Sequence, residues 1–250
     1  MPRLATYAAA ILLVSRPCYA ADEWRETRAL PAAEAHQAAA ADEKHVYAIN
    51  NTVVARYDRK TGERLAVSTG EALHLNSGFW REGRLYCAHS NYPRTPEKSE
   101  LKVLDLATMK LTTAKDFGNY GGSLTWAVWH DERWWCNFAR YGGANRETFL
   151  ARMDGEWREE ARWTYPDEVL RKIGQASISG GVWHGGLLTV TDHDHEALYR
   201  LRVPAKGEVL EFVREEAAPF AGQGIALDPV TGGLVGIQRS KRLVIFAERK

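Results

Sequence analysis

The sequence predicts an all-β protein, a five-bladed β-propeller whose N-terminal strand closes the last blade. A unit made of a polar turn and an apolar strand occurs five times, at intervals of 39 to 53 residues, which suits a four-stranded blade. Its strands start at Val46, Leu85, Trp134, Leu187 and Leu234. The fifth unit ends near the C-terminus without an outer strand, and a spare strand precedes the first unit.

The first twenty residues predict a secretory signal peptide. A basic start is followed by an apolar stretch over residues 4–14 and the small-residue site Cys18-Tyr19-Ala20. The apolar stretch is too short to anchor the chain in a bilayer, and no later segment approaches transmembrane length. The alternative is an amphipathic N-terminal helix. We expect cleavage after Ala20 and a periplasmic or secreted protein.

Residues 21–250 are then expected to form a single propeller domain. In the last blade, Trp24 to Leu30 would pair with Arg242 to Phe246 and so remove an exposed sheet edge. Residues 166–174 predict a short helix after the third blade. A two-sheet sandwich is the alternative fold, but it would not produce five units in phase. The expected blades cover about residues 36–70, 71–117, 118–166, 175–216, and 220–250 together with 24–32.

Charge and cysteine content limit the partners and the cross-links. With 33 Lys and Arg against 32 Asp and Glu, the net charge of +1 argues against a nucleic-acid partner. We expect a monomer that binds a small-molecule ligand. Cys87 and Cys136 hold equivalent positions in adjacent blades. Because packed sheets lie roughly 10 Å apart, both are expected to remain free thiols.

Polar residues recur in the inner strands, where a closed apolar core would carry Val or Leu. Two interpretations are open. The side chains either bind a ligand at the floor of the channel mouth or hydrogen-bond the backbone and water in a narrow channel. The five residues are Gln37, Asn76, Thr125, Ser179 and Gln223.

Five of the eight histidines fall at one end of the repeat unit, the predicted functional rim. Imidazole transfers protons near neutral pH, a carboxylate can orient it, and a guanidinium can hold an oxyanion. The histidines are His36, His74, His89, His193 and His195. The other rim residues predicted to bind a ligand are Asn91, Tyr92, Tyr120, Arg140 and Arg239.

A metal site is an alternative use of the same residues. The run from Asp192 to Glu196 is dense in ligands for a divalent metal such as Ca²⁺ or Zn²⁺, and His74 and His89 could approach it from a neighbouring blade. Adjacent residues of a strand point to opposite faces, and no known ligand spacing is present. A solvated acidic loop is therefore the preferred interpretation, and no cofactor is implied.

Several strings in the chain resemble a family of small secreted bacterial five-bladed propellers that are often labelled cycloisomerases. The resemblance covers nearly the whole mature chain and implies a propeller fold. The resemblance implies the string Thr-Gly-His-Asp at residues 191–194. This chain has Asp192 in place of the glycine and keeps His193 and Asp194. The strings lie at residues 74–78, 87–93, 123–126, 134–135, 222–225 and 235–237.

A looser resemblance is to the five-bladed glutaminyl cyclases, which have similar length, a signal peptide and a site at the channel mouth. The chain lacks the strings Phe-Thr-Gln-Gly-Leu and Phe-Gly-Glu-Gly that are associated with that family. The resemblance therefore implies a shared fold and no shared reaction.

These observations lead to two functional hypotheses. In the first, the chain is an enzyme of the lactonase or cycloisomerase kind, in which His89 or His193 moves a proton and Asp194 orients the imidazole. Arg140 or Arg239 would hold a carboxylate. In the second, the same face belongs to a non-catalytic module that binds a glycan, a peptide or a protein. We favour the enzyme.

Overall fold

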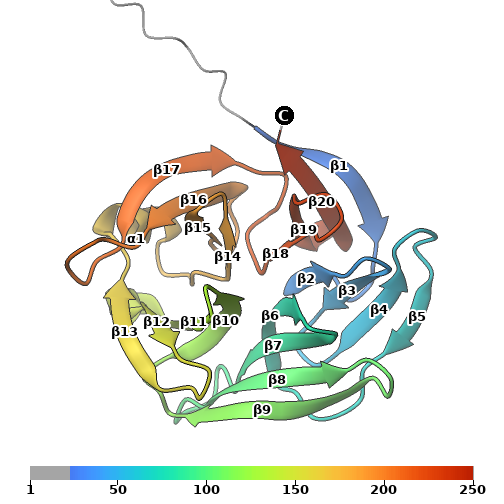
Figure 1. Ribbon diagram of the computed structural model, residues 1–250, viewed down its shortest axis with the longest axis horizontal. Coiled ribbons are helices and arrows are strands. Elements are labelled where there is room, and N and C mark those ends of the chain that lie inside the picture. The colour runs from blue at the N-terminus through green and yellow to red at the C-terminus, as the bar shows by residue number, and fades with distance from the viewer. Residues whose placement is uncertain (1–22, 250) are drawn as a thin grey trace, which may run out of the picture.

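Five four-stranded antiparallel sheets are arranged in a ring in the computed structural model, which describes residues 23–249 (Figure 1). This arrangement confirms the predicted five-bladed β-propeller. The predicted signal peptide lies outside the described residues. Within residues 23–249, no helix is long and apolar enough to cross a membrane.

The first four blades follow chain order from the channel outward (Figure 1). The first blade consists of β2 (Ala38–Ala41), β3 (His45–Ile49), β4 (Val54–Asp58) and β5 (Arg64–Val67). The second consists of β6 (His74–Arg81), β7 (Arg84–Ser90), β8 (Ser99–Asp105) and β9 (Lys110–Gly118).

The third blade consists of β10 (Ser123–His130), β11 (Arg133–Ala139), β12 (Phe149–Met153) and β13 (Glu159–Thr164), with the 3₁₀ helix η1 (Gly142–Glu147) before β12. The predicted short helix is present as α1 (Asp167–Ile173) and leads into the fourth blade. That blade consists of β14 (Gly180–His184), β15 (Leu187–Thr191), β16 (Ala197–Arg202) and β17 (Glu211–Ala217).

The fifth blade joins the two ends of the described chain. Its outer strand, β1 (Trp24–Pro31), pairs antiparallel with β20, so that Leu30 lies opposite Val244 and Trp24 opposite Arg249. This pairing confirms the predicted closure of the ring by the N-terminal strand (Figure 1). The other strands are β18 (Ala226–Leu227), β19 (Leu234–Gln238) and β20 (Leu243–Arg249), with η2 (Arg239–Lys241) before β20.

A buried carboxylate ties the closing strand to the fourth blade. Glu216 of β17 accepts hydrogen bonds from the Trp24 indole at 2.8 Å and from Arg214 at 2.7 Å, and it also pairs with Arg249. Burial alone would raise the pKa of this carboxyl, but hydrogen bonds from Arg249, Trp24 and Arg214 lower it to about 2. The carboxylate is therefore ionised and holds Trp24 and Arg249, at the two ends of the described chain, against the fourth blade.

Small residues at the axis let the inner strands approach one another. The four alanines of β2 are fully buried, and Gly181 of β14 lies against Trp126 of β10. A Cβ atom at Gly181 would come within 2.5 Å of the Trp126 ring, so that the indole can be buried only because this position is glycine. The cores lie between neighbouring blades, and Trp126 is fully buried in one of them.

Asn76 and Thr125 share a special position, because each is the unpaired residue of a β-bulge in its inner strand. The Asn76 amide donates to the carbonyl of Leu124 at 2.9 Å, and the Thr125 hydroxyl donates to the carbonyl of Ile178 at 2.7 Å. In both cases the acceptor belongs to the next blade. At these two positions the polar side chains therefore hydrogen-bond the backbone, as one of the two interpretations of the inner-strand residues predicted.

Cys87 and Cys136 are free and fully buried, which confirms the predicted free thiols. Burial raises the pKa of the Cys87 thiol to about 12 and raises that of Cys136 as well. Both thiols are therefore protonated and unreactive in the folded protein.

Deletion of residues 23–31 should destabilise the domain by at least ~5 kcal/mol, because it removes the buried Trp24 and Leu30 and exposes the edge of β20. Urea unfolding of the deletion variant and the mature protein measures the effect. An Arg25→Thr, Glu26→Thr variant is the control, since it keeps the backbone pairing and the two buried side chains. A deletion variant as stable as this control would contradict closure by β1.

Candidate functional site

A cavity of about 470 Å³ opens at the end of the channel where the inner strands begin, and it contacts residues of all five blades. Most of its lining side chains are amides, hydroxyls and imidazoles. Arg239 contributes a positive charge, and no Asp or Glu among the described residues lines the cavity. The lining residues are Gln37, Asn51, His74, Asn76, Tyr92, Tyr141, Gly142, Gln175, Ala176, Ser177, Ser179, His193, Gln223 and Arg239.

The floor of this channel-mouth cavity consists of polar groups that also bond to one another. The Gln37 amide donates to Asn51 Oδ1 at 2.5 Å, and the hydroxyls of Ser177 and Ser179 lie 2.7 Å apart. Gln37, Ser177 and Ser179 are buried. Amides and hydroxyls fixed in this way can serve a hydroxylated ligand as either donors or acceptors.

One wall of the cavity is aromatic. The rings of His74 and Tyr92 lie 5.4 Å apart, and those of Tyr92 and Tyr141 lie 4.8 Å apart. Tyr92 is 43% exposed, so this row of rings leads from the cavity to the surface of the rim. Burial raises the pKa of Tyr141 to about 12, which keeps its phenol protonated as a hydrogen-bond donor.

His193 lies between a carboxylate and a guanidinium. Its Nδ1 lies 2.8 Å from Asp194 Oδ2, and its Nε2 lies 3.3 Å from an Arg239 guanidinium nitrogen. A guanidinium has only donors, so Nε2 must accept in this contact, which places the imidazole proton on Nδ1, facing the carboxylate. The unprotonated nitrogen therefore lies beside Arg239 at the cavity.

The backbone of His193 is held by the segment that leads into β18. Gln223 donates from its backbone N–H to the carbonyl of Asp192 at 2.8 Å and from its side-chain amide to the carbonyl of His193 at 2.6 Å. Gly222 and Gln223 both have left-handed φ angles, +64° and +68°. A left-handed backbone at a buried glutamine is strained and needs support from its surroundings, which these bonds supply.

Two further histidines lie near His193 and are kept neutral. Burial, followed by the charges of Arg239 and Arg242, lowers the pKa of His36 to about 4. Burial, followed by Arg239 and His193, also lowers the pKa of His74. A bound anion would offset the repulsion from the arginines, so that ligand binding and proton uptake at these imidazoles are coupled.

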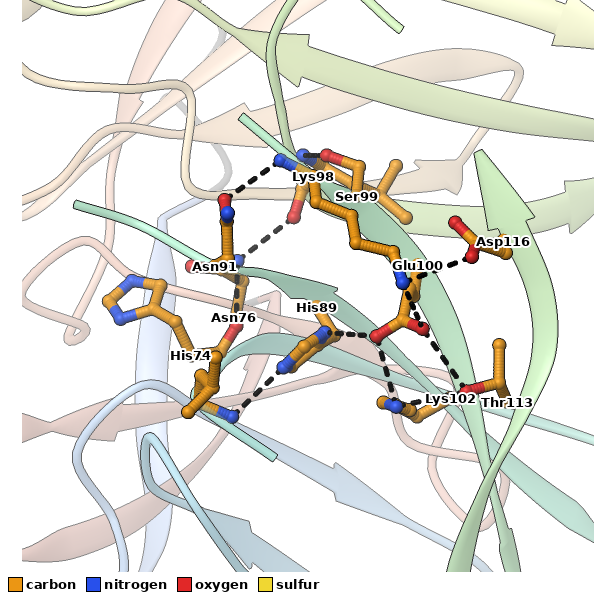
Figure 2. Close-up of polar contacts among 12 residues, drawn as sticks. His74, Asn76, His89, Asn91, Lys98, Ser99, Glu100, Lys102, Thr113 and Asp116 are labelled. Carbon is orange, nitrogen blue, oxygen red and sulfur yellow. Dashed lines mark hydrogen bonds and ion pairs between the residues drawn. The ribbon is translucent and has the colours of Figure 1, made fainter. Parts of the chain in front are cut away.

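The structure places His89 outside the cavity, which corrects its predicted place among the catalytic residues. The Leu73 backbone N–H donates to Nε2 at 2.9 Å, and Nδ1 lies 3.1 Å from Glu100 Oε2. Figure 2 shows His89 directed toward Glu100 and Lys102, while His74 points the other way. His89 is 4% exposed, and both of its ring nitrogens face protein groups.

Four other predicted ligand-binding residues also lie apart from the cavity. Asn91 bonds within its own loop, to Pro96 and Lys98. Tyr120 donates to Glu159 on the outer strand of its blade. Thr125 is 1% exposed and bonds to the next blade, as described above. Arg140 lies 3.7 Å from Glu97 and 3.5 Å from Glu147.

The acidic run does not form a metal centre. Asp192 is 1% exposed and turns inward, where it accepts from the backbone N–H groups of Asp194 and His195 and contacts the His195 ring. It therefore braces its own loop. Across residues 23–249, no group of three His, Cys, Asp or Glu side chains is placed to hold a metal ion.

Several lining residues were missing from the predicted site. Tyr141 directly follows Arg140, which was predicted to bind the ligand. The Tyr141 ring lines the cavity, whereas the Arg140 side chain turns outward. Asn51 and Gln175 lie in connections between strands, and Ser177 begins the approach to the fourth inner strand. Asn50 marks a turn in the sequence, and such connections converge on one face of a propeller. The sequence therefore contained a signal that could have predicted Asn51 as a lining residue.

The other end of the channel has a different character. A cavity of about 540 Å³ there is lined by Trp80, Trp129 and Trp183, the penultimate residues of β6, β10 and β14. The Trp183 ring stacks on His130 at 4.5 Å, and Trp80 stacks on Tyr47 at 6.1 Å. The two channel mouths therefore differ in chemistry, one polar and one aromatic.

Fold and site together define a five-bladed propeller with a polar cavity at one channel mouth. No family model matches the sequence, and no curated protein matches it. A glutaminyl cyclase from Myxococcus xanthus has a similar structure, with a TM-score of 0.62 and 9% identity over 92% of this chain and 97% of that chain. The β-propeller domain of Cps50 (Swd1) from Myceliophteria thermophila has a TM-score of 0.50 and 9% identity over 90% and 99% of the respective chains. These likenesses show the fold alone.

The buried His89 should make the protein less stable in acid. Burial and then the Lys102 ammonium lower its pKa from 6.5 to about 4, so that between these values the unfolded chain binds a proton that the folded chain does not. The stability present above pH 6.5 is therefore lost as the pH falls. In His89→Gln, whose side-chain oxygen can still accept from Leu73, the loss between pH 7 and pH 4.5 should be smaller by about 2 kcal/mol. Urea unfolding at the two pH values measures this, and equal losses would contradict it.

Gly222→Ala should destabilise the protein by about 2 kcal/mol or more. A Cβ atom would meet the strained φ and also approach the carbonyl carbon of His193 within 2.4 Å. Gly232→Ala is the matched control, because its φ is +73° but nothing lies within 4 Å of the added atom, so it should lose only about 1 kcal/mol. Equal losses in urea unfolding would show that Gly222 is not needed for its contact with His193.

Proposed function

We propose that this chain is a secreted or periplasmic propeller that binds a small hydroxylated or anionic molecule in the channel-mouth cavity. The observation that carries the proposal is the composition of the lining: amides, hydroxyls, imidazoles and Arg239, without a carboxylate among the described residues. Hydroxyl groups find partners there, and a negative charge meets no like charge.

We further propose that the bound molecule undergoes acid–base ring chemistry of the lactonase or cycloisomerase kind. In the lactonase form, His193 Nε2 removes a proton from a water molecule while the water oxygen bonds to the lactone carbonyl carbon. The carbon–oxygen bond of the ring then breaks, and the leaving oxygen takes the proton from His193. The product is a hydroxy acid, and the reverse sequence closes the ring.

Two neighbours of His193 support this role. The Asp194 carboxylate, 2.8 Å from Nδ1, would stabilise the imidazolium that forms when Nε2 takes the proton. The Arg239 guanidinium, 3.3 Å from Nε2, would stabilise the negative charge that develops on the carbonyl oxygen. Base and positive charge thus lie side by side at one wall of the cavity.

The alternative function is a non-catalytic module that binds a glycan, a peptide or a protein. It is favoured by the exposure of Tyr92, 43%, at the cavity and of Leu73, 46%, next to the lining residue His74 in the sequence. A larger partner that enters the cavity with one group would cover these side chains.

The test is a panel of lactones and hydroxy acids, assayed for turnover and for thermal stabilisation of the protein. His193→Gln should lower kcat on an active lactone by about 100-fold or more and still be stabilised by the ligand. His195→Gln is the control, because this residue shares the loop but does not line the cavity. Ligand stabilisation without turnover by the unchanged protein would instead support the binding module, and equal kcat values in both variants would exclude His193 as the base.

Export is tested by expressing residues 1–250 in a Gram-negative bacterium and measuring the mass of the protein in each compartment. A chain that begins at Ala21 in the periplasm is expected, because the predicted signal peptidase site follows Ala20. An uncleaved chain confined to the cytoplasm would contradict the proposed location.

A further inference from the structure

A second cavity adjoins the channel-mouth cavity and shares one of its walls. This outer cavity, about 390 Å³ in volume, is lined by His36, Asp194, Ala221, Gln238, Arg239, Ser240 and Arg242. Arg239 lines both cavities, and the neighbours His193 and Asp194 line one each. The candidate base therefore lies at the junction of the two spaces, and one elongated ligand could occupy both.

The outer cavity has an unbalanced positive charge. Neither Arg239 nor Arg242 forms an ion pair within residues 23–249, and Asp194 contributes a single carboxylate to the lining. Two guanidinium groups against one carboxylate leave one net positive charge. His36 adds none at neutral pH, because its pKa is lowered to about 4. The charge of the lining therefore matches a ligand group with one negative charge.

The backbone of Arg242 is fixed although its side chain is exposed. Its carbonyl accepts from the Ala32 N–H at 2.9 Å, directly after the closing strand β1, and its own N–H donates to the carbonyl of Arg239 at 3.3 Å. The left-handed φ of +56° belongs to the turn between η2 and β20. Both guanidinium groups thus come from one braced turn, and their planar donor arrangement suits the two oxygens of a carboxylate.

We propose that the outer cavity is a carboxylate subsite and that the ligand is a polyhydroxylated carboxylic acid, such as a sugar acid. This inference rests on the proposed function and names its substrate class. The hydroxylated part of the ligand fills the channel-mouth cavity, and Arg242 binds the carboxylate in the outer cavity. Arg239, which lines both cavities, lies between this carboxylate and the reacting ring atoms beside His193. A phosphate, which carries up to two negative charges, fits less well because Asp194 lines the same cavity.

Calorimetric titration of the mature protein with matched acids and neutral analogues tests the subsite. The probes are D-glucuronate against D-glucose, and D-gluconate against D-glucitol. Each acid should bind at least about tenfold more tightly than its analogue, and added salt should reduce the difference. Arg242→Gln should remove the difference without changing the affinity for the neutral analogue. Lys241→Gln is the control, because this exposed neighbour lines neither cavity and should leave both affinities unchanged.

The outcomes separate this inference from the function on which it rests. Equal binding of acids and neutral analogues would overturn the carboxylate subsite and leave the hydroxylated-ligand proposal standing. If none of the four compounds binds, acetate tests the subsite alone. Thermal stabilisation by acetate that Arg242→Gln loses and Lys241→Gln keeps would support the subsite but not the sugar-acid class. The absence of that stabilisation would overturn the subsite and the class together.

Discussion

The pairing of β1 with β20 is the constraint on which the rest of the structure depends, because it converts a row of five sheets into a ring. Each blade buries its apolar faces against two neighbours, so an open ring would leave the first and fifth blades with one uncovered face each. The backbone ladder of β1 is reinforced by Glu216, which bonds to Trp24 of β1 and pairs with Arg249 of β20. Closure therefore combines strand pairing, burial of Trp24 and Leu30, and a buried ionised carboxylate.

The candidate site is a product of the same closure. Its residues come from all five blades, and the groups nearest the proposed chemistry lie on the fourth and fifth. His193 is held from the fifth blade by Gln223, and Arg242 is braced by the residue that follows β1. The arginines that lower the pKa of His36 belong to the turn before β20. The charge and geometry of the polar mouth are thus set by contacts between blades.

The repeat in the sequence was sufficient to predict the blade order and the closing strand, because the period specifies which residues are equivalent. It was not sufficient to predict how far each side chain lies from the channel. Thr125 occupies the same bulge position as Asn76, yet Asn76 lines the cavity and Thr125 is covered by the next blade. His89 has the residue type expected of a base, but its ring is buried against a backbone N–H and a carboxylate and does not line the cavity. Side-chain direction depends on bulges and on partners far away in sequence, which the period does not encode.

The last blade takes strands from both ends of the described chain, so that it is offset by one strand from the sequence repeat. This offset determines how the chain can be permuted and how it can gain or lose a blade. Each repeat unit in the sequence spans one blade in the first four cases, but the last sheet takes three strands from one end of the described chain and one strand from the other. Trp24 and Arg249 are therefore paired neighbours on the two outermost strands of the fifth blade. The two ends could be joined by a short linker and the chain reopened between two blades, so that every sheet would be contiguous in sequence. A gene that gained or lost a blade would need to keep the one-strand offset, since an insertion that broke it would separate β1 from its partner.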